Sequence, residues 1–196
     1  VPFVAPKKYF DLYDATDFTV PQSTDGYLNT IPEPAAISVR RKKEQVAIDP
    51  DLAKEIKRAY YATTSFMDAQ IGRVLDKLKA TGLDKNTIVV FTSDHGYHLG
   101  EHGHWQKQTL FEDATRVPLI ISGPGVTTTN EVVKAPVELV DLYPTIMDVA
   151  DLKPPSFVSG KSLVPYFTNS KAAVRSSALT ELQVNIGNKK AQGYGI

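Results

Sequence analysis

The residues best suited to chemistry lie in one short segment. All four histidines of the chain fall between positions 95 and 104, and the only tryptophan, Trp105, follows them. Asp94 and His95 offer a carboxylate oxygen and an imidazole nitrogen, which are both common metal ligands. Glycines at 96, 100 and 103 allow the backbone to turn sharply around such a site. The pattern favours a metal site that needs further ligands from elsewhere, and its alternative is a solvated surface loop.

The elements around this segment predict an α/β fold. The apolar run 87–92 does not alternate with polar residues, so we expect a strand buried on both faces, as in a parallel sheet. Open α/β sheets bind ligands at the carboxyl ends of their strands, which is where Asp94 and His95 lie. A second buried strand is expected over 118–121 and a third over 136–140.

Helical signals flank these strands. Asp49 and Pro50 predict a helix start, and apolar residues then recur at the 3.6-residue period as far as Leu78, with Gly82 as the end. We expect this long helix to pack against a large sheet. Asp141 predicts the cap of a second helix. The prolines of residues 1–48 indicate an irregular segment with one short helix after Pro6, and residues 193–196 indicate the start of a strand.

Composition excludes several function classes. Lys plus Arg and Asp plus Glu each number 22, so the net charge is zero, which argues against a nucleic-acid partner. The basic run Arg40-Arg41-Lys42-Lys43 is therefore interpreted as a solvated face. No apolar run approaches the roughly 20 residues of a membrane span, so no membrane partner is expected. Without cysteine there is neither a disulfide nor a thiol nucleophile. The start at Val1 and Pro2 suggests a processed chain or an excised fragment.

Several motifs together resemble one family. They are Thr92-Ser93-Asp94-His95-Gly96, Leu99-Gly100-Glu101-His102-Gly103, Trp105-x-Lys107 and Ala114-Thr115-Arg116-Val117-Pro118-Leu119-Ile120. This set resembles the sulfatases of the alkaline-phosphatase superfamily. Because His95 follows Asp94, the resemblance is closest to iduronate-2-sulfatase-like members. The resemblance implies an alkaline-phosphatase-like α/β fold with a mostly parallel sheet flanked by helices. It implies a connecting segment over 1–48, a catalytic core over 49–165 and the beginning of a small C-terminal subdomain over 166–196.

The resemblance also implies an activity and its residues. Such enzymes hydrolyse sulfate esters at a divalent cation, with Ca²⁺ first, while Mg²⁺ or Mn²⁺ remain open because imidazole is an unusual calcium ligand. Asp94 and His95 match two metal ligands, and Lys107 matches a lysine that contacts the sulfate. Tyr97 and His98 are weaker candidates for substrate contact. The substrate is expected to be a sulfated small molecule or saccharide, and the compartment periplasmic, secreted or lysosomal.

The remaining aromatic residues of the segment carry different expectations. His102 is expected to orient the loop through its ring nitrogens. For His104, substrate contact and simple exposure stay equally open. Trp105 is expected to anchor the loop by packing beneath it.

One departure from the family bears on activity. The family's nucleophile is a formylglycine made from a C/S-x-P-x-R motif, and this motif does not occur in the printed sequence. We therefore expect a middle-to-C-terminal portion of a sulfatase, inactive alone, whose partner is the missing N-terminal part of the same enzyme. The alternatives are a phosphatase or phosphonate monoester hydrolase of the same superfamily, and a non-catalytic binding module.

Overall fold

The protein is described by a computed structural model that covers residues 3–40, 45, 48–186 and 189–196. Its contacts divide the chain into two units. Unit 1 comprises Val1–Asp84, His95–Arg116 and Ile186–Lys189, and unit 2 comprises Lys85–Asp94, Val117–Asn185 and Lys190–Ile196. Residues 95–116, called the histidine segment below, belong to unit 1, whereas residues 85–94 before them belong to unit 2. Arg41, Lys42 and Lys43 of the basic run lie outside the described residues.

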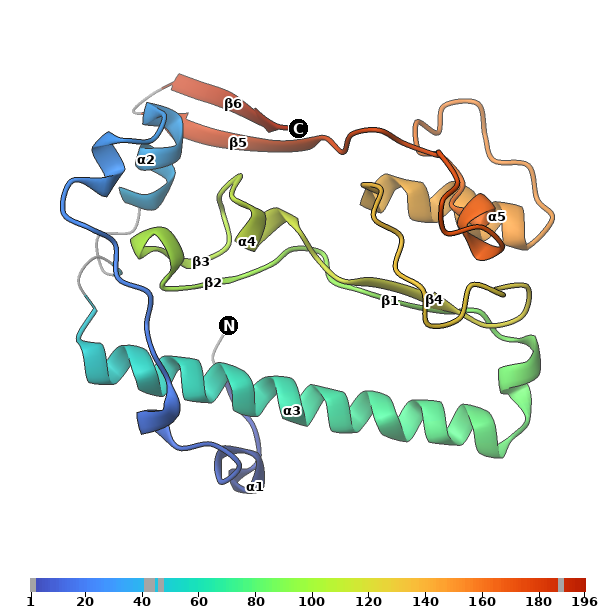
Figure 1. Ribbon diagram of the computed structural model, residues 1–196, viewed down its shortest axis with the longest axis horizontal. Helices are drawn as coiled ribbons and strands as arrows, with labels where there is room; N and C mark the ends of the chain where they lie inside the picture. The colour runs from blue at the N-terminus through green and yellow to red at the C-terminus, as the bar shows by residue number, and fades with distance from the viewer. Residues whose placement is uncertain (1–2, 41–44, 46–47, 187–188) are drawn as a thin grey trace. The chain divides into compact units, whose positions relative to one another are not determined.

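The longest element is helix α3, Pro50–Ala80 (Figure 1). It begins as predicted, because the carboxylate of Asp49 accepts hydrogen bonds from the backbone N–H groups of Asp51 and Leu52, each at 3.0 Å. It ends shortly before Gly82, whose φ of +71° lies in the left-handed region that glycine tolerates. Helix α3 is long enough to cross a bilayer but too polar to do so. None of the other described helices is both long and apolar enough.

The apolar stripe of α3 is only partly covered. We expect it to pack against a large sheet, but four of its side chains are 43–68% exposed: Leu52, Met67, Val74 and Leu75. Instead, helix α1 (Lys7–Phe10) contacts α3. Next to it, the hydroxyls of Tyr13 and Ser65 lie 2.6 Å apart. The helical period predicts which side of a helix is apolar, but it does not predict what covers that side.

Residues 1–48 contain more regular structure than the irregular segment that we expect. Besides α1 they form the 3-10 helices η1 (Ala15–Asp17) and η2 (Tyr27–Asn29) and the eight-residue helix α2 (Glu33–Arg40). Proline is accepted in the first turn of a helix, so Pro34 does not prevent α2. The short helix predicted after Pro6 is α1.

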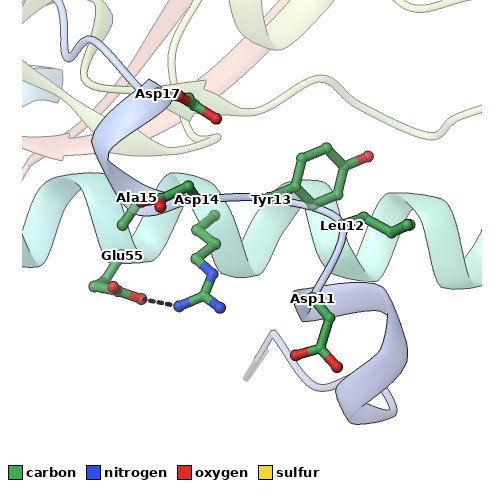
Figure 2. Close-up of a pocket in the computed structure, with 8 residues that line it drawn as sticks. Asp11, Leu12, Tyr13, Asp14, Ala15, Asp17 and Glu55 are labelled. Atoms are coloured by element: carbon green, nitrogen blue, oxygen red, sulfur yellow. Dashed lines mark hydrogen bonds and ion pairs between the residues drawn. The ribbon is translucent and has the colours of Figure 1, made fainter.

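A cavity of about 540 Å³ opens between η1 and the first part of α3 (Figure 2). It is lined by Asp11, Leu12, Tyr13, Asp14, Ala15, Asp17, Glu55 and Arg58. Arg58 balances part of the acidic charge, because its Nη1 lies 3.4 Å from Oε2 of Glu55. The predicted site residues Asp94, His95, Tyr97, His98 and Lys107 do not line this cavity.

The histidine segment folds into four short elements of unit 1. Strands β2 (His98–Leu99) and β3 (Trp105–Gln106) pair antiparallel, with His98 opposite Gln106 and Leu99 opposite Trp105. The 3-10 helix η5 (Glu101–Gly103) connects them. Helix α4 (Glu112–Thr115) ends the segment. This hairpin returns the chain on itself and brings together side chains that are ten or more residues apart.

Unit 2 contains the two predicted strands, β1 (Val89–Thr92) and β4 (Leu119–Ser122) (Figure 1). They pair antiparallel, with Val89 opposite Ser122 and Thr92 opposite Leu119. The parallel pairing that we expect is therefore wrong for these strands. Burial on both faces is also wrong, because β1 is half-buried and β4 alternates between half-buried and exposed residues. A short apolar run predicts a strand but not its direction or its cover.

The strand expected over 136–140 is also wrong. Leu139–Asp141 forms the 3-10 helix η6, after which the predicted helix α5 runs over Leu142–Val149. The backbone turns here because Glu138 and Asp141 form a capping box, in which each side chain accepts a hydrogen bond from the other's backbone. The 3-10 helix η7 (Val164–Phe167) follows. Strands β5 (Thr180–Ile186) and β6 (Lys189–Gly195) pair with each other, and β6 contains most of the strand expected at 193–196.

Asp141 does not cap α5 with its side chain as expected. Its buried carboxylate accepts hydrogen bonds from Arg175, at 2.6 Å from Nη2 and 3.2 Å from Nε. The backbone N–H groups of Lys161 and Glu138 also donate to it, at 2.7 and 2.9 Å. Burial alone would raise the pKa of Asp141, but these hydrogen bonds and the charge of Arg175 together hold it below its usual value. A buried ion pair therefore joins the start of α5 to the segment before β5.

Candidate functional site

Asp94 lies where the sequence predicts a ligand site. It follows the last residue of β1 by two positions, and its side chain is exposed. His95 comes next and is half-buried. The two expected metal ligands are therefore consecutive residues at the carboxyl end of a strand, as predicted.

The ring of His95 has a defined orientation. Its Nδ1 lies 2.7 Å from the carbonyl oxygen of Gly96, and its Nε2 lies 2.6 Å from Nζ of Lys107. Since a carbonyl oxygen only accepts, Nδ1 carries the proton, and Nε2 accepts from the lysine ammonium through its lone pair. A histidine held by Nδ1–H on a backbone carbonyl, with its Nε2 lone pair directed at a positive charge, is arranged as a metal ligand is.

Gly96 holds the two ends of the histidine segment together. Its N–H donates to the carbonyl oxygen of Ala114 at 2.8 Å. A β-carbon at Gly96 would lie 2.0 Å from the carbonyl oxygen of Asp113, which is far inside van der Waals contact. Only glycine permits this close approach of two backbone segments.

We expect Gly96→Ala to lower the free energy of unfolding by about 2–4 kcal/mol, because the backbone must move apart and loses a hydrogen bond. Gly72→Ala is the matched control. Gly72 lies inside α3 with open space around it, so alanine there should stabilise by about 0.5–1 kcal/mol. Urea denaturation followed by circular dichroism measures both. A Gly96→Ala variant as stable as the wild type would contradict the close packing.

His98 lies inside the hairpin and has no exposed surface. Its Nε2 lies 2.8 Å from Oγ1 of Thr109, and its Nδ1 lies 4.0 Å from Oδ2 of Asp113. Burial lowers the pKa of His98 despite the opposing charge of Asp113, so the ring is neutral at pH 7. Because a fully buried ring offers no surface to a substrate, this position does not favour the weak substrate contact predicted for His98.

His102 uses both ring nitrogens to hold the loop, as expected, with one partner in η2 and one in α4. Nδ1 lies 2.5 Å from the hydroxyl of Tyr27, and Nε2 lies 3.3 Å from Oδ2 of Asp113. The ring also stacks on Phe111, with centroids 3.9 Å apart and planes 12° apart. These contacts support the backbone of His102, whose φ of +58° is unusual for a residue other than glycine.

The structure also places His104, Trp105 and Tyr97. His104 is 2% exposed and its ring centroid lies 4.9 Å from that of His98, so simple exposure is wrong for it. Trp105 is 6% exposed, which confirms it as a packing anchor. Tyr97 is half-buried between Phe3 and Tyr60, with ring centroids 5.6 Å from each, and burial raises its pKa. Its expected contact with substrate stays a prediction.

Sequence reasoning missed three side chains of this segment: Glu101, Thr109 and Asp113. Glu101 accepts a hydrogen bond from the backbone N–H of Leu99 at 2.5 Å. Asp113 lies between His98 and His102, eleven or more residues away along the chain. Gly96 is the one sequence signal for this contact, because a glycine often marks a place where another segment approaches closely. Spacing alone does not say which segment approaches.

The family model described as "Sulfatase" matches residues 5–152 of the chain, which is well over half of it. The chain belongs to the sulfatase family. A sulfatase from Formosa agariphila is 36% identical over 198 residues, which cover 99% of this chain and 39% of that protein. Human iduronate 2-sulfatase is 36% identical over 139 residues, 65% of this chain and 25% of that protein. The expected resemblance to iduronate 2-sulfatase is confirmed, but not that it is the closest, because the Formosa agariphila sulfatase matches at the same identity over more of this chain.

A solved structure confirms the predicted α/β fold of alkaline-phosphatase-like type. The phosphonate monoester hydrolase SpPMH from Silicibacter pomeroyi superimposes with a TM-score of 0.84 at 31% identity. The match covers 95% of this chain and 39% of that one. The sulfatase chain described here thus spans about two fifths of the length of these two bacterial proteins.

Proposed function

We propose that the protein is part of a sulfatase that hydrolyses the sulfate ester of a saccharide or other small molecule at a divalent cation. One observation carries the proposal. Nζ of Lys107 lies 2.6 Å from Nε2 of His95. The resemblance gives Lys107 a contact with the sulfate and His95 a place among the metal ligands. The fold brings the two side chains together although they are twelve positions apart in the sequence.

Members of the sulfatase family generally use a divalent cation. Asp94 and His95 fit such an ion, because they offer an exposed carboxylate and a nitrogen lone pair already directed at a positive charge. When bound, the ion would polarise the sulfate and lower the pKa of the nucleophile. Ca²⁺ is the first candidate, with Mg²⁺ or Mn²⁺ compatible with the same donors.

Lys107 would bind the sulfate group. Its ammonium is a compact charge that can donate several hydrogen bonds to a tetrahedral anion. As the ester bond breaks, negative charge grows on the oxygens, and a fixed donor stabilises that charge more than it stabilises the ground state. His95 keeps its orientation through Nδ1–H on Gly96, so the ring would not have to turn during the reaction.

The nucleophile must come from outside the printed sequence under this proposal. No C/S-x-P-x-R motif occurs among the 196 residues. The sugar class of the substrate is supported by human iduronate 2-sulfatase, whose name specifies a sugar acid. The second candidate function is hydrolysis of a phosphonate monoester, which the superposition on SpPMH favours. Comparing kcat/KM for an aryl sulfate and for a phenylphosphonate monoester in the complete enzyme separates the two.

In the complete enzyme we expect Lys107→Ala to lower kcat/KM for 4-nitrocatechol sulfate by about 10²–10³-fold, since one donor to a developing charge is lost. Stability should change by no more than about 0.5 kcal/mol, because the side chain is exposed. Lys79→Ala, on the exposed side of α3, is the control and should leave both values unchanged. If the Lys107→Ala variant unfolds at a lower urea concentration than the wild type but keeps its specific activity, Lys107 is structural and the proposed role is wrong.

A further inference from the structure

The β2–β3 hairpin buries one ring nitrogen of His98, Nδ1, beside two carboxylates. Nδ1 of His98 makes no hydrogen bond of normal distance and angle among the described residues, although the side chain is fully buried. Buried polar atoms in folded proteins nearly always have a partner, so an exception calls for an explanation. The nearest carboxylate oxygen, Oδ2 of Asp113, lies 4.0 Å away, which is too far for a hydrogen bond.

Two carboxylates lie around this nitrogen. His98, Glu101 and Asp113 each offer one ligand atom, and these atoms all lie within 4.8 Å of one another. The three residues come from β2, η5 and α4, so the hairpin itself gathers them. Two carboxylates without a compensating cation would repel each other at this distance, and an imidazole lone pair between them adds to that repulsion.

We propose that His98 Nδ1, Glu101 and Asp113 bind a divalent transition-metal ion of the Zn²⁺ class. One imidazole nitrogen with two carboxylate oxygens is a donor set that Zn²⁺ accepts, whereas Ca²⁺ prefers six to eight oxygens. This site shares no ligand with Asp94 and His95, and the proposal does not depend on the proposed function.

The surrounding contacts are those that a ligating histidine needs. Nε2 of His98 lies 2.8 Å from Oγ1 of Thr109, which is itself 4% exposed. If Nε2–H donates to this hydroxyl, the lone pair of Nδ1 points at the carboxylates, as in metal sites where the second ring nitrogen is fixed by an outer partner. His102 fixes Asp113 in the same way, through Nε2 at 3.3 Å from Oδ2.

The ion requires the three donor atoms, which lie within 4.8 Å of one another, to approach by up to about 1.4 Å. Zn²⁺ bonds of about 2.0–2.2 Å hold tetrahedral donors about 3.4 Å apart. The 4.0 Å between Nδ1 of His98 and Oδ2 of Asp113 would then shorten by about half an ångström. Asp113 can make this movement, because its side chain is 34% exposed.

The test is Zn²⁺ retention by the purified protein. The protein is dialysed against buffer that holds excess Ca²⁺ and a trace of Zn²⁺, and bound metal is measured by mass spectrometry. Excess Ca²⁺ fills oxygen-rich sites. Because the proposed Asp94–His95 site also offers a nitrogen, the Asp94→Ala variant below tells the two sites apart. We expect one Zn²⁺ per chain, and Co²⁺ in its place should give the visible absorption bands of a nitrogen- and oxygen-ligated ion.

Matched variants locate the ion. Asp113→Asn and Glu101→Gln should each weaken Zn²⁺ binding at least about 10–100-fold, the range seen when only an outer-shell partner is removed. Glu112→Gln, an exposed neighbour on α4, and Asp94→Ala should retain the zinc. Circular dichroism confirms that each variant is folded. Absence of zinc from the wild type, or equal retention by Asp113→Asn and Glu112→Gln, would overturn the proposal.

Discussion

In the complete enzyme, replacing Asp94 with alanine is expected to lower the turnover of a sulfate ester by at least about 10³-fold. Asp94 offers the one anionic ligand in the pair Asp94-His95, and its exposed carboxylate lies two positions after the last residue of β1. Polarisation by a metal ion contributes several kcal/mol to lowering a barrier, and each 1.4 kcal/mol or so corresponds to tenfold in rate. Turnover of 4-nitrocatechol sulfate and calcium content by mass spectrometry measure the effect.

Two further variants separate loss of the ligand from loss of the fold. Asp76→Ala removes an exposed carboxylate from α3 and should keep full activity. Asp94→Asn keeps the size of the side chain and one oxygen donor, so activity should fall while the unfolding curve stays unchanged. Near-normal turnover of Asp94→Ala together with unchanged metal content would show that Asp94 is not a ligand.

The largest effect on stability is expected at Asp141. Asp141→Ala would leave the guanidinium of Arg175, which is only 14% exposed, with Glu138 at 2.9 Å as its remaining carboxylate. It would also leave the N–H groups of Lys161 and Glu138 without their acceptor. Removing one member of a buried ion pair typically costs about 3–5 kcal/mol, and we expect a loss in that range by urea denaturation. Asp76→Asn on the surface of α3 is the control, and a loss below about 1 kcal/mol would contradict the buried pair.

The same ion pair predicts how stability depends on pH. The pKa of Asp141 is lower in the folded protein than its usual value, so the unfolded chain binds the proton more readily. Its contribution is therefore complete above the ordinary carboxyl pKa of about 3.9 and is lost as the pH falls through the lower, folded value. Asp141→Asn should accordingly lose less stability than the wild type between neutral pH and pH values below about 4. Equal losses in the two proteins would place the acid sensitivity elsewhere.

Local signals in the sequence predicted the local elements well. The start of α3 depends on Asp49 and Pro50, which are adjacent to the helix, and its end depends on Gly82. Signals that depend on distant residues failed. The direction of β1 against β4 is decided by pairing between residues such as Val89 and Ser122, far apart in the sequence. The carboxylate of Asp141 binds Arg175 rather than its own helix. A residue's type shows that it can cap or pair, but the partner is decided by the tertiary fold.

In the candidate site, too, the local features could be predicted from the sequence and the tertiary contacts could not. Asp94, His95 and Lys107 are predicted as site residues because their motifs are contiguous and resemble those of a family, and these roles stay predictions. The contact between His95 and Lys107, the burial of His98 and the position of Asp113 between two histidines all arise from the β2–β3 hairpin. Residue spacing in a segment of this length does not reveal which side chains turn inward, because three glycines allow many backbone paths.

The chain has a single tryptophan, and the hairpin buries it two residues before Lys107. Fluorescence excited at wavelengths that tyrosine does not absorb therefore comes from this segment and from nowhere else in the 196 residues. The indole lies on β3 opposite Leu99, so a change in the packing or polarity of the hairpin alters its emission. The unmodified protein thus contains an optical reporter at its candidate site, with which cations and sulfated sugars can be titrated without a label.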